Sequence, residues 1–305
     1  MRTLFVGAGA TGGYFGGRLA GIGKDVTFLV RPERAATLAC RGLRIKGPDD
    51  EIVVRPRTVT AGALDGPYDL VVLAIKAYGL EQAMADLAPA VGSRTVIVPL
   101  LNGMRHVDAL LGAFSEEHVY GGVCMIHATL DGDGDVVQFT GLHRLMFGPI
   151  DGGPDDRLGA VTEALSGGGF DSAPSDTIEQ DMWEKWMFLT SLGAATTLMR
   201  AAVGDINAAP GGPAFAAGIA AEAVAVATAA GHPPRDGAVA FLRAGITSTA
   251  KTTSSLYRDM VQGRPVEADA ILGDFVATAD RTGVATPLLS AAYANLAIYA
   301  AGLKG

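Results

Sequence analysis

Lysine is rare in this sequence, and two of its lysines lie where they could do chemistry. The 305-residue chain has six lysines, at positions 24, 46, 76, 185, 251 and 304. Lys76 ends the apolar run YDLVVLAIK, and Lys185 lies in the segment DMWEKW. An ammonium group can donate a proton to an alkoxide that develops on a substrate, so both are candidate acids. For each lysine taken alone, a solvated surface cation is the ordinary alternative.

A glycine-rich loop near the N-terminus predicts a dinucleotide site. The apolar residues 3–6 precede GAGATGG, and a helix-like segment and the apolar run DVTFLV follow it. In GxGxxG the first glycine permits a tight turn, the second lets the backbone approach a pyrophosphate, and the third lets the helix pack on the sheet. The alternative is a tight turn without a ligand. The loop residues expected to bind the cofactor are Gly7, Ala8, Gly9, Ala10, Thr11 and Gly12.

The end of the second apolar run indicates which dinucleotide is bound. Sites for NAD usually end this strand with Asp or Glu, which holds the ribose 2′-hydroxyl. Here the run ends in Val30 and Arg31, and Arg34 follows. A cation in place of a carboxylate suits a 2′-phosphate, so the sequence favours NADP over NAD. The alternative is that Arg31 is a solvated loop residue.

The elements around these residues predict two domains. Strand-like runs alternate with helix-like segments, at 32–40 and 79–90 among others, in the first half, which is typical of a doubly wound, mostly parallel sheet. Residues 41–47 and 51–59 look like an antiparallel excursion from it. Lys76 and Asn102 each follow a strand-like run, at the carboxyl edge where ligands bind. The second half is rich in Ala, and we expect helices over 182–200, 213–230, 235–244, 266–283 and 287–300. We therefore expect a Rossmann-like α/β domain over 1–175, an all-α substrate and catalytic domain over 176–305, and a ligand in the cleft between them.

Composition excludes several classes of protein. About half of the residues are hydrophobic (49%), which provides cores, and the net charge of −8 argues against nucleic-acid or polybasic membrane binding. Cys40 and Cys124 have no CxxC spacing, and the five histidines lack ligand spacing, so we expect no metal site and a reduced, cytoplasmic setting. Charged residues and glycines break the apolar runs, so no transmembrane helix is predicted.

Several segments together resemble the ketopantoate reductase (2-dehydropantoate 2-reductase) family. They run in the family's order from residue 1 to about 290, and the WxK and SSLxxDxxxGRxxExD elements are the specific ones. The segments are GAGATGGYFG, VTFLVR, IKAYGL, LLNGM, the WEK of DMWEKW, SSLYRDMVQGRPVEADAILG and GVATP.

The resemblance implies roles for five residues. It makes Lys185 the general acid that protonates the ketone oxygen, and it makes Glu267 and Ser255 substrate-binding residues. Lys76 and Asn102 match family residues near the nicotinamide ribose and the reacting carbonyl, so they are expected to contact both cofactor and substrate. Outside this pattern, Glu267 with Asp269 would be an ordinary helix-start carboxylate pair.

The sequence departs from the family pattern after the WxK lysine. The family has asparagines four and eight residues further on, whereas this chain has Leu189 and Gly193. Hydroxyls at Thr190, Ser191, Thr196 and Thr197 lie at other helical angles. Leu101 also replaces the glutamine usual before the family's NG. We expect a roomier, more apolar pocket, and a different 2-oxo acid or ketone could be its substrate.

The resemblance implies NADPH-dependent reduction of a 2-oxo acid to a 2-hydroxy acid, such as ketopantoate to pantoate in pantothenate biosynthesis. One alternative is a reductase of the same fold acting on a different, more apolar carbonyl substrate. Another is a non-catalytic NADP-binding sensor, although a sensor needs neither Lys185 nor Glu267. The expected partner is a small 2-oxo acid. A homodimer is compatible with the sequence.

Overall fold

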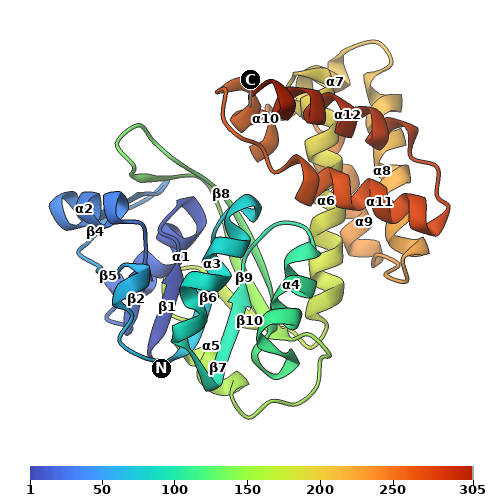
Figure 1. The fold of residues 1–305 in the computed structure, drawn as a ribbon. Coiled ribbons are helices and arrows are strands. Elements are labelled where there is room, and N and C mark those ends of the chain that lie inside the picture. Colours follow the sequence, from blue (N-terminus) through green and yellow to red (C-terminus); the bar gives the residue numbers. More distant parts are fainter. Residues whose placement is uncertain (304–305) are drawn as a thin grey trace. The chain divides into compact units, whose positions relative to one another are not determined.

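The computed structural model describes residues 1–303, which form two compact units. The first unit holds residues 1–101 and 106–179, and the second holds residues 102–105 and the described residues from 180 to 303. In Figure 1 the first unit is blue to yellow-green, and most of the second is yellow to red. The boundary predicted from the sequence, between 175 and 176, falls in the loop between β10 (Asp171–Pro174) and α6 (Ile178–Met199).

A five-stranded parallel sheet is the first layer of unit 1. Its hydrogen bonds follow the order β5-β2-β1-β6-β7, and every recorded pairing is parallel. Strands β1 and β2 are buried throughout, which explains their continuous apolar sequences. The predicted parallel sheet is thus confirmed. The strands are β1 (Thr3–Val6), β2 (Val26–Leu29), β5 (Arg57–Val59), β6 (Tyr68–Leu73) and β7 (Val91–Pro99).

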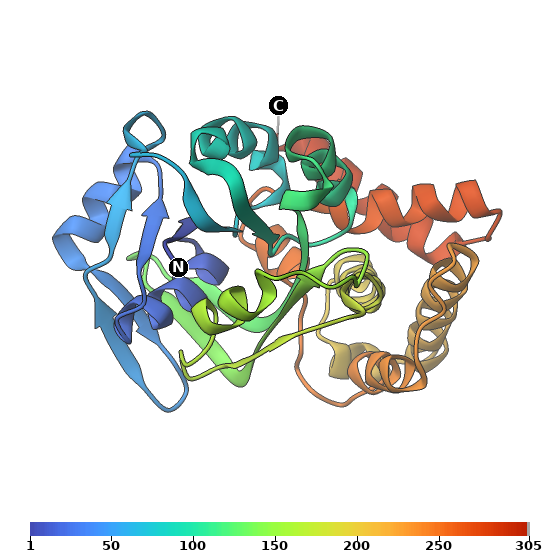
Figure 2. The same ribbon diagram turned by 90° about the horizontal axis from the view of Figure 1, so that it is seen from below.

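A second, mixed sheet lies in the same unit. It follows the order β10-β9-β3-β4, with β8 (Tyr120–Leu130) paired to β9 (Val136–Pro149). Figure 2 shows the blue hairpin of β3 (Leu43–Lys46) and β4 (Glu51–Val54) with the green β8–β9 hairpin. The pairing of β3 with β4 is antiparallel, as predicted. The continuation of that segment differs, because β5 pairs in parallel with β2 in the other sheet.

Helix α1 (Ala10–Gly21) packs against both sheets, and its glycines make this approach feasible. A Cβ atom on Gly16 would lie 2.7 Å from the Phe28 ring of the parallel sheet. One on Gly17 would lie 2.7 Å from the Leu43 side chain of the mixed sheet. A helix that carries side chains on both faces could not sit this close, so the excess of glycine in α1 has a packing cause.

The remaining helices of unit 1 flank these sheets. The predicted segments at Pro32 and Gly79 form helices, whereas two short helices have no counterpart in the sequence analysis. The helices are α2 (Pro32–Arg41), α3 (Leu80–Leu87), α4 (Arg105–Phe114) and α5 (Leu158–Ala164).

Unit 2 is helical, as predicted, and two of its helices were not expected from the sequence. Both are short: α7 covers Val203–Ala208 and α10 covers Ser255–Val261. A π-helical turn, η5 (Asp269–Gly273), leads directly into α11 (Asp274–Thr282), where the sequence suggests one uniform helix. The other helices are α6, α8 (Gly212–Ala229), α9 (Asp236–Ile246) and α12 (Pro287–Gly302).

Helix α8 is long and apolar enough, by length and composition, to cross a membrane. In the structure it serves as a core helix of unit 2, with Ile219, Ala223 and Val226 buried. Its Glu222 carboxylate accepts hydrogen bonds from the amides of Leu288 and Leu289, at 3.0 and 2.9 Å, and so caps α12. About 39% of α8 is buried, so packing inside unit 2 accounts for part of its apolar composition.

Candidate active site

The glycine loop that follows β1 fits a pyrophosphate. Gly7 has φ +96°, and a Cβ atom there would lie 2.7 Å from the Ala74 carbonyl oxygen. A Cβ atom on Gly12 would lie 2.2 Å from the Gly7 oxygen, whereas one on Gly9 would meet nothing within 4 Å. The loop is therefore closed on the sheet side and open beside Gly9. At the start of α1, the amides of residues 10–12 face out of the helix end, where a phosphate can accept from them.

Two other predicted cofactor residues lie at the same edge of the parallel sheet. The Gly7 amide donates to the Leu29 oxygen at 2.9 Å, which joins the loop to the end of β2. Arg31 comes two residues later, exposed at the N-cap of α2. Lys76 caps a 3₁₀ turn (Ala77–Gly79) that follows β6, and its side chain is exposed. Unit 1 thus brings the loop, Arg31 and Lys76 to one edge, as the order of the strands requires.

The structure distinguishes Arg31 from Arg34. The Arg34 Nε and Nη2 atoms donate to the Ala8 carbonyl oxygen at 3.1 and 2.9 Å. Burial lowers the pKa of the Arg34 guanidinium, an effect that the charge of Asp135 opposes. From the sequence alone, Arg34 has no assigned role. Its spacing of one helical turn from Arg31, at the start of α2, is the signal that could have assigned one.

Asn102 belongs with the helical unit. A Cβ atom on the adjacent Gly103 would lie 2.2 Å from the Ala270 oxygen, and Gly103 has φ +82°. Arg105 also forms an ion pair with Asp274. The turn that carries Asn102 therefore packs on η5, two residues beyond Glu267 in sequence. The expectation that Asn102 lies in the α/β domain has to be corrected, because this close packing clusters residues 102–105 with unit 2.

Lys185 and Glu267 are both buried in unit 2, at 9% and 5% exposure. Two hydrogen bonds join α6, which carries Lys185, to the π turn that follows Glu267. The Trp186 indole and the Thr190 hydroxyl both donate to the Ile271 carbonyl oxygen, at 2.9 and 3.0 Å. Ile271 lies in the π turn, whose i→i+5 pattern departs from the usual helical ladder, and its carbonyl accepts both bonds. Sequence reasoning did not identify this link, although Trp186 adjoins Lys185 in the motif.

The two serines of the SSL segment have different positions. Ser254 is the N-cap of α10: its Oγ accepts from the Tyr257 amide at 3.0 Å and lies 2.7 Å from the Thr196 hydroxyl. Ser255 is the first helical residue and is half-buried. Capping thus occupies Ser254, while Ser255, which is the predicted substrate residue, takes no part in the cap.

The expectation of a roomier pocket at the missing asparagines needs a correction at Gly193. A Cβ atom there would lie 2.9 Å from Leu256 Cδ1 and 3.3 Å from Leu272 Cδ1, so leucine side chains fill this space. Leu189 is half-buried against the same apolar core. The local environment is therefore apolar, as expected, but it is not enlarged at Gly193.

The nearby hydroxyls cannot simply replace the asparagines, because each is engaged within unit 2. Apart from the Thr190 bond to Ile271 and the Thr196 contact with the Ser254 hydroxyl, these bonds go to backbone carbonyls of α6 itself. Ser191 donates to Met187, Thr196 to Leu192 and Thr197 to Gly193, at 2.7–2.8 Å.

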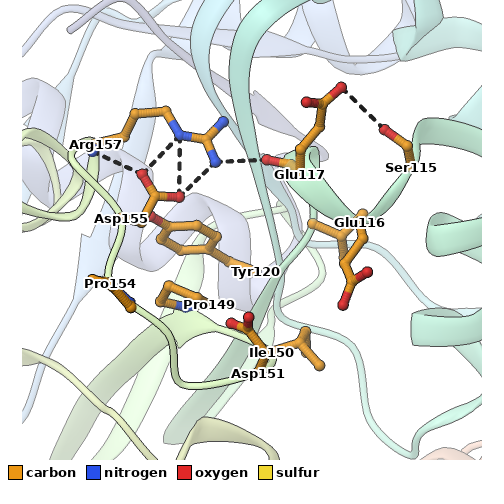
Figure 3. A pocket seen from close by; sticks show the side chains of 11 residues that line it. Ser115, Glu116, Glu117, Tyr120, Pro149, Ile150, Asp151, Pro154, Asp155 and Arg157 are labelled. Atoms are coloured by element: carbon orange, nitrogen blue, oxygen red, sulfur yellow. Dashed lines mark hydrogen bonds and ion pairs between the residues drawn. The ribbon is translucent and has the colours of Figure 1, made fainter.

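A separate hollow of about 510 Å³ in unit 1 contains none of the predicted site residues (Figure 3). Its arginine, Arg157, is already paired with the Asp155 carboxylate at 2.5 Å and donates to the backbone carbonyl oxygen of Glu117 at 2.6 Å. This pairing lowers the pKa of Asp155 to about 2. With Glu116 and Asp151 also lining it, the hollow repels anions. It is therefore a poor site for a 2-oxo acid or a dinucleotide.

Comparisons with known proteins agree with this arrangement. The family model "Ketopantoate reductase PanE/ApbA" matches residues 3–152, and its C-terminal companion matches residues 177–300. The chain is 38% identical to the uncharacterized oxidoreductase YkpB of Bacillus subtilis, over 99% of both chains. It is 28% identical to the 2-dehydropantoate 2-reductase of Halobacterium salinarum, over 95% of both.

A solved structure shares the fold across nearly the whole chain. It is the ternary structure of D-mandelate dehydrogenase with NADH and anilino(oxo)acetate, with a TM-score of 0.87 and 23% identity. The match covers 99% of this chain and 100% of that one.

The different surroundings of two loop glycines predict separable effects of alanine. Gly9→Ala adds a methyl group to open space at φ −81°, so the thermal midpoint should change little. The methyl group should nevertheless exclude a pyrophosphate and weaken dinucleotide binding by about tenfold or more. Gly12→Ala should lower the thermal midpoint, because its methyl group overlaps the Gly7 carbonyl.

Differential scanning fluorimetry and cofactor titration of both variants test this prediction. If Gly9→Ala binds NADPH and NADH as tightly as the wild type, the open side of the loop does not face the pyrophosphate.

Proposed function

We propose, because the chain belongs to the ketopantoate reductase family, that it reduces a 2-oxo acid to the 2-hydroxy acid with NADPH. The chain is an oxidoreductase of this family, and the proposal concerns its cofactor and its substrate. The observation that carries the proposal is the burial of Lys185 and Glu267 in one unit. Their segments are tied together at the Ile271 carbonyl.

Buried Lys185 and Glu267 can serve complementary functions toward a substrate that carries hydroxyl or carboxylate groups. Isolated charges are costly to bury, so a buried ammonium and carboxylate are retained for interactions that repay that cost. A lysine ammonium can stabilise negative charge on a ketone oxygen and donate a proton to it. The Glu267 carboxylate can accept a hydrogen bond from a distal hydroxyl. A non-catalytic NADP sensor would need neither group.

The reaction then divides between the two units. When bound, the nicotinamide supplies a hydride, with its electron pair, to the carbonyl carbon of the 2-oxo acid. The Lys185 Nζ–H bond breaks as its proton moves to the carbonyl oxygen, which gives a 2-hydroxy acid. Ser255 and Asn102 orient the substrate, and Lys76 lies with the loop residues at the cofactor edge. Residues of the glycine loop hold the phosphates through backbone amides.

An apolar 2-oxo acid is favoured as the substrate over ketopantoate. Leu189 takes one family asparagine position, and leucine side chains fill the space beside Gly193. Losing the two asparagine amides leaves fewer hydrogen-bonding partners for a polar substrate, and such losses shift specificity strongly. The fold match to a D-mandelate dehydrogenase supports the same view, since that enzyme acts on a 2-hydroxy acid with an aromatic side chain. We further propose that the enzyme acts in the cytoplasm.

A panel of 2-oxo acids tests the choice of substrate. Oxidation of NADPH is followed at 340 nm with ketopantoate and with 2-oxo acids that carry aliphatic or aromatic side chains. The best apolar substrate should exceed ketopantoate in kcat/KM by about tenfold or more. If ketopantoate is the best substrate, its recognition does not need asparagines at the positions of Leu189 and Gly193. If no member of the panel is reduced, the proposed reaction is wrong.

The exposed Arg31 predicts a preference for NADPH. One charge-assisted contact to the 2′-phosphate should make NADPH bind roughly tenfold tighter than NADH. Arg31→Ala should lose most of this preference by weakening NADPH alone, as measured by fluorescence titration. Equal affinity of the wild type for both cofactors would contradict the assignment.

Removing the acid should slow the reaction without preventing cofactor binding. Lys185→Ala should lower kcat by about 10²–10⁴-fold, which is the usual contribution of a positioned acid. NADPH affinity should stay near that of the wild type, because the glycine loop belongs to unit 1.

Lys251→Ala is the matched control, since Lys251 is exposed on the same unit and paired with Asp205. A normal kcat for Lys185→Ala would show that Lys185 is not the general acid, and Lys76 would be the next candidate for that role.

A further inference from the structure

The Ala8 carbonyl is held from outside the glycine loop. Arg34, in the first turn of α2, directs two N–H groups at this one oxygen, at 3.1 and 2.9 Å. Ala8 is itself buried, with 4% exposure, so its carbonyl depends on protein donors. Two donors from a planar guanidinium fix both the position and the direction of the oxygen.

Holding this oxygen also sets the direction of the next amide. The Ala8–Gly9 peptide is trans, since no cis peptide bond occurs among residues 1–303. In a planar trans peptide the C=O and N–H bonds point in opposite directions. Turning the Ala8 oxygen toward Arg34 therefore turns the Gly9 N–H away from it. Gly9 is the residue beside which the loop is open, where a pyrophosphate would approach.

The β8–β9 turn keeps the Arg34 guanidinium in place. Gly134, with φ +81°, approaches so closely that a Cβ atom there would lie 2.7 Å from Arg34 Nη1. The neighbouring Asp135 is buried and attracts the Arg34 charge. Arg41, also on α2, pairs with Asp133 at 3.3 Å and with Asp135 at 3.5 Å. The turn thus anchors α2 as well as the side chain that reaches the loop.

We propose that Arg34 is a positioning residue for the pyrophosphate. It acts through the Ala8–Gly9 peptide and sets the affinity of the loop for both NADPH and NADH. The choice between the two would rest with Arg31, which is exposed three residues earlier. This inference rests on the nucleotide site in the proposed function, and it assigns different roles to two arginines that the sequence alone does not distinguish.

The test measures the affinity of the full-length protein for NADPH and for NADH, without substrate. Arg34→Ala should weaken both by about tenfold or more, with an unchanged ratio, because the loop amide loses its fixed direction. At saturating cofactor, kcat should stay near the wild-type value. Arg34→Lys keeps the charge but not the fork of donors, and it should recover part of the lost affinity for both nucleotides.

Arg94→Ala is the control, because it removes an exposed arginine of the same unit whose partner is Asp156 rather than a residue of the β8–β9 turn. It should leave both affinities unchanged. Thermal unfolding of each variant identifies loss of fold, and if Arg34→Ala is unfolded, Arg34→Lys carries the test. A loss confined to NADPH would overturn the inference and place Arg34 on the 2′-phosphate. Unchanged affinities in both Arg34 variants would also overturn it, whereas a wild type that binds neither nucleotide refutes the proposed function itself.

Discussion

The close approach of α1 to two sheets is the constraint on which the first unit depends. Gly16 and Gly17 bring the helix backbone within reach of Phe28 on one side and Leu43 on the other. The same closeness fixes the start of α1, where Gly12 lies against the Gly7 carbonyl. A phosphate loop binds an anion through backbone amides, so its precision depends on a helix that cannot shift. The geometry of the loop therefore depends directly on how α1 packs in the core.

The second unit positions its candidate residues mainly through polar contacts. Lys185 and Glu267 come from segments far apart in sequence, and the Ile271 carbonyl joins these segments through the Trp186 and Thr190 side chains. The Gly103 turn packs on the same π-helical segment, so Asn102 is held near it. A π turn costs helical regularity, and it is retained here where it offers a carbonyl to α6. Positioning in this unit therefore relies on one unusual turn.

The distribution of charge agrees with the anionic substrate and cofactor that we propose. The hollow of Figure 3 is acidic, and its arginine is neutralised by Asp155. The cations assigned to function, by contrast, lie at the carboxyl edge of the parallel sheet or inside the helical unit. Arg34 shows that a cation near the loop can act without touching a ligand, because its donors are used on the protein backbone.

The sequence by itself determined the fold class and the residues worth testing. Periodicity and the glycine spacing predicted the parallel sheet, the helical second half and the nucleotide loop, because these signals are local in the chain. The short helices α7 and α10 and the π turn escaped prediction, since they depend on tertiary contacts. Only the tertiary structure showed that Asn102 clusters with the helical unit, that leucine side chains fill the space at Gly193, and that Arg34 holds Ala8. Each of these facts concerns atoms distant in sequence, whose proximity is decided by packing.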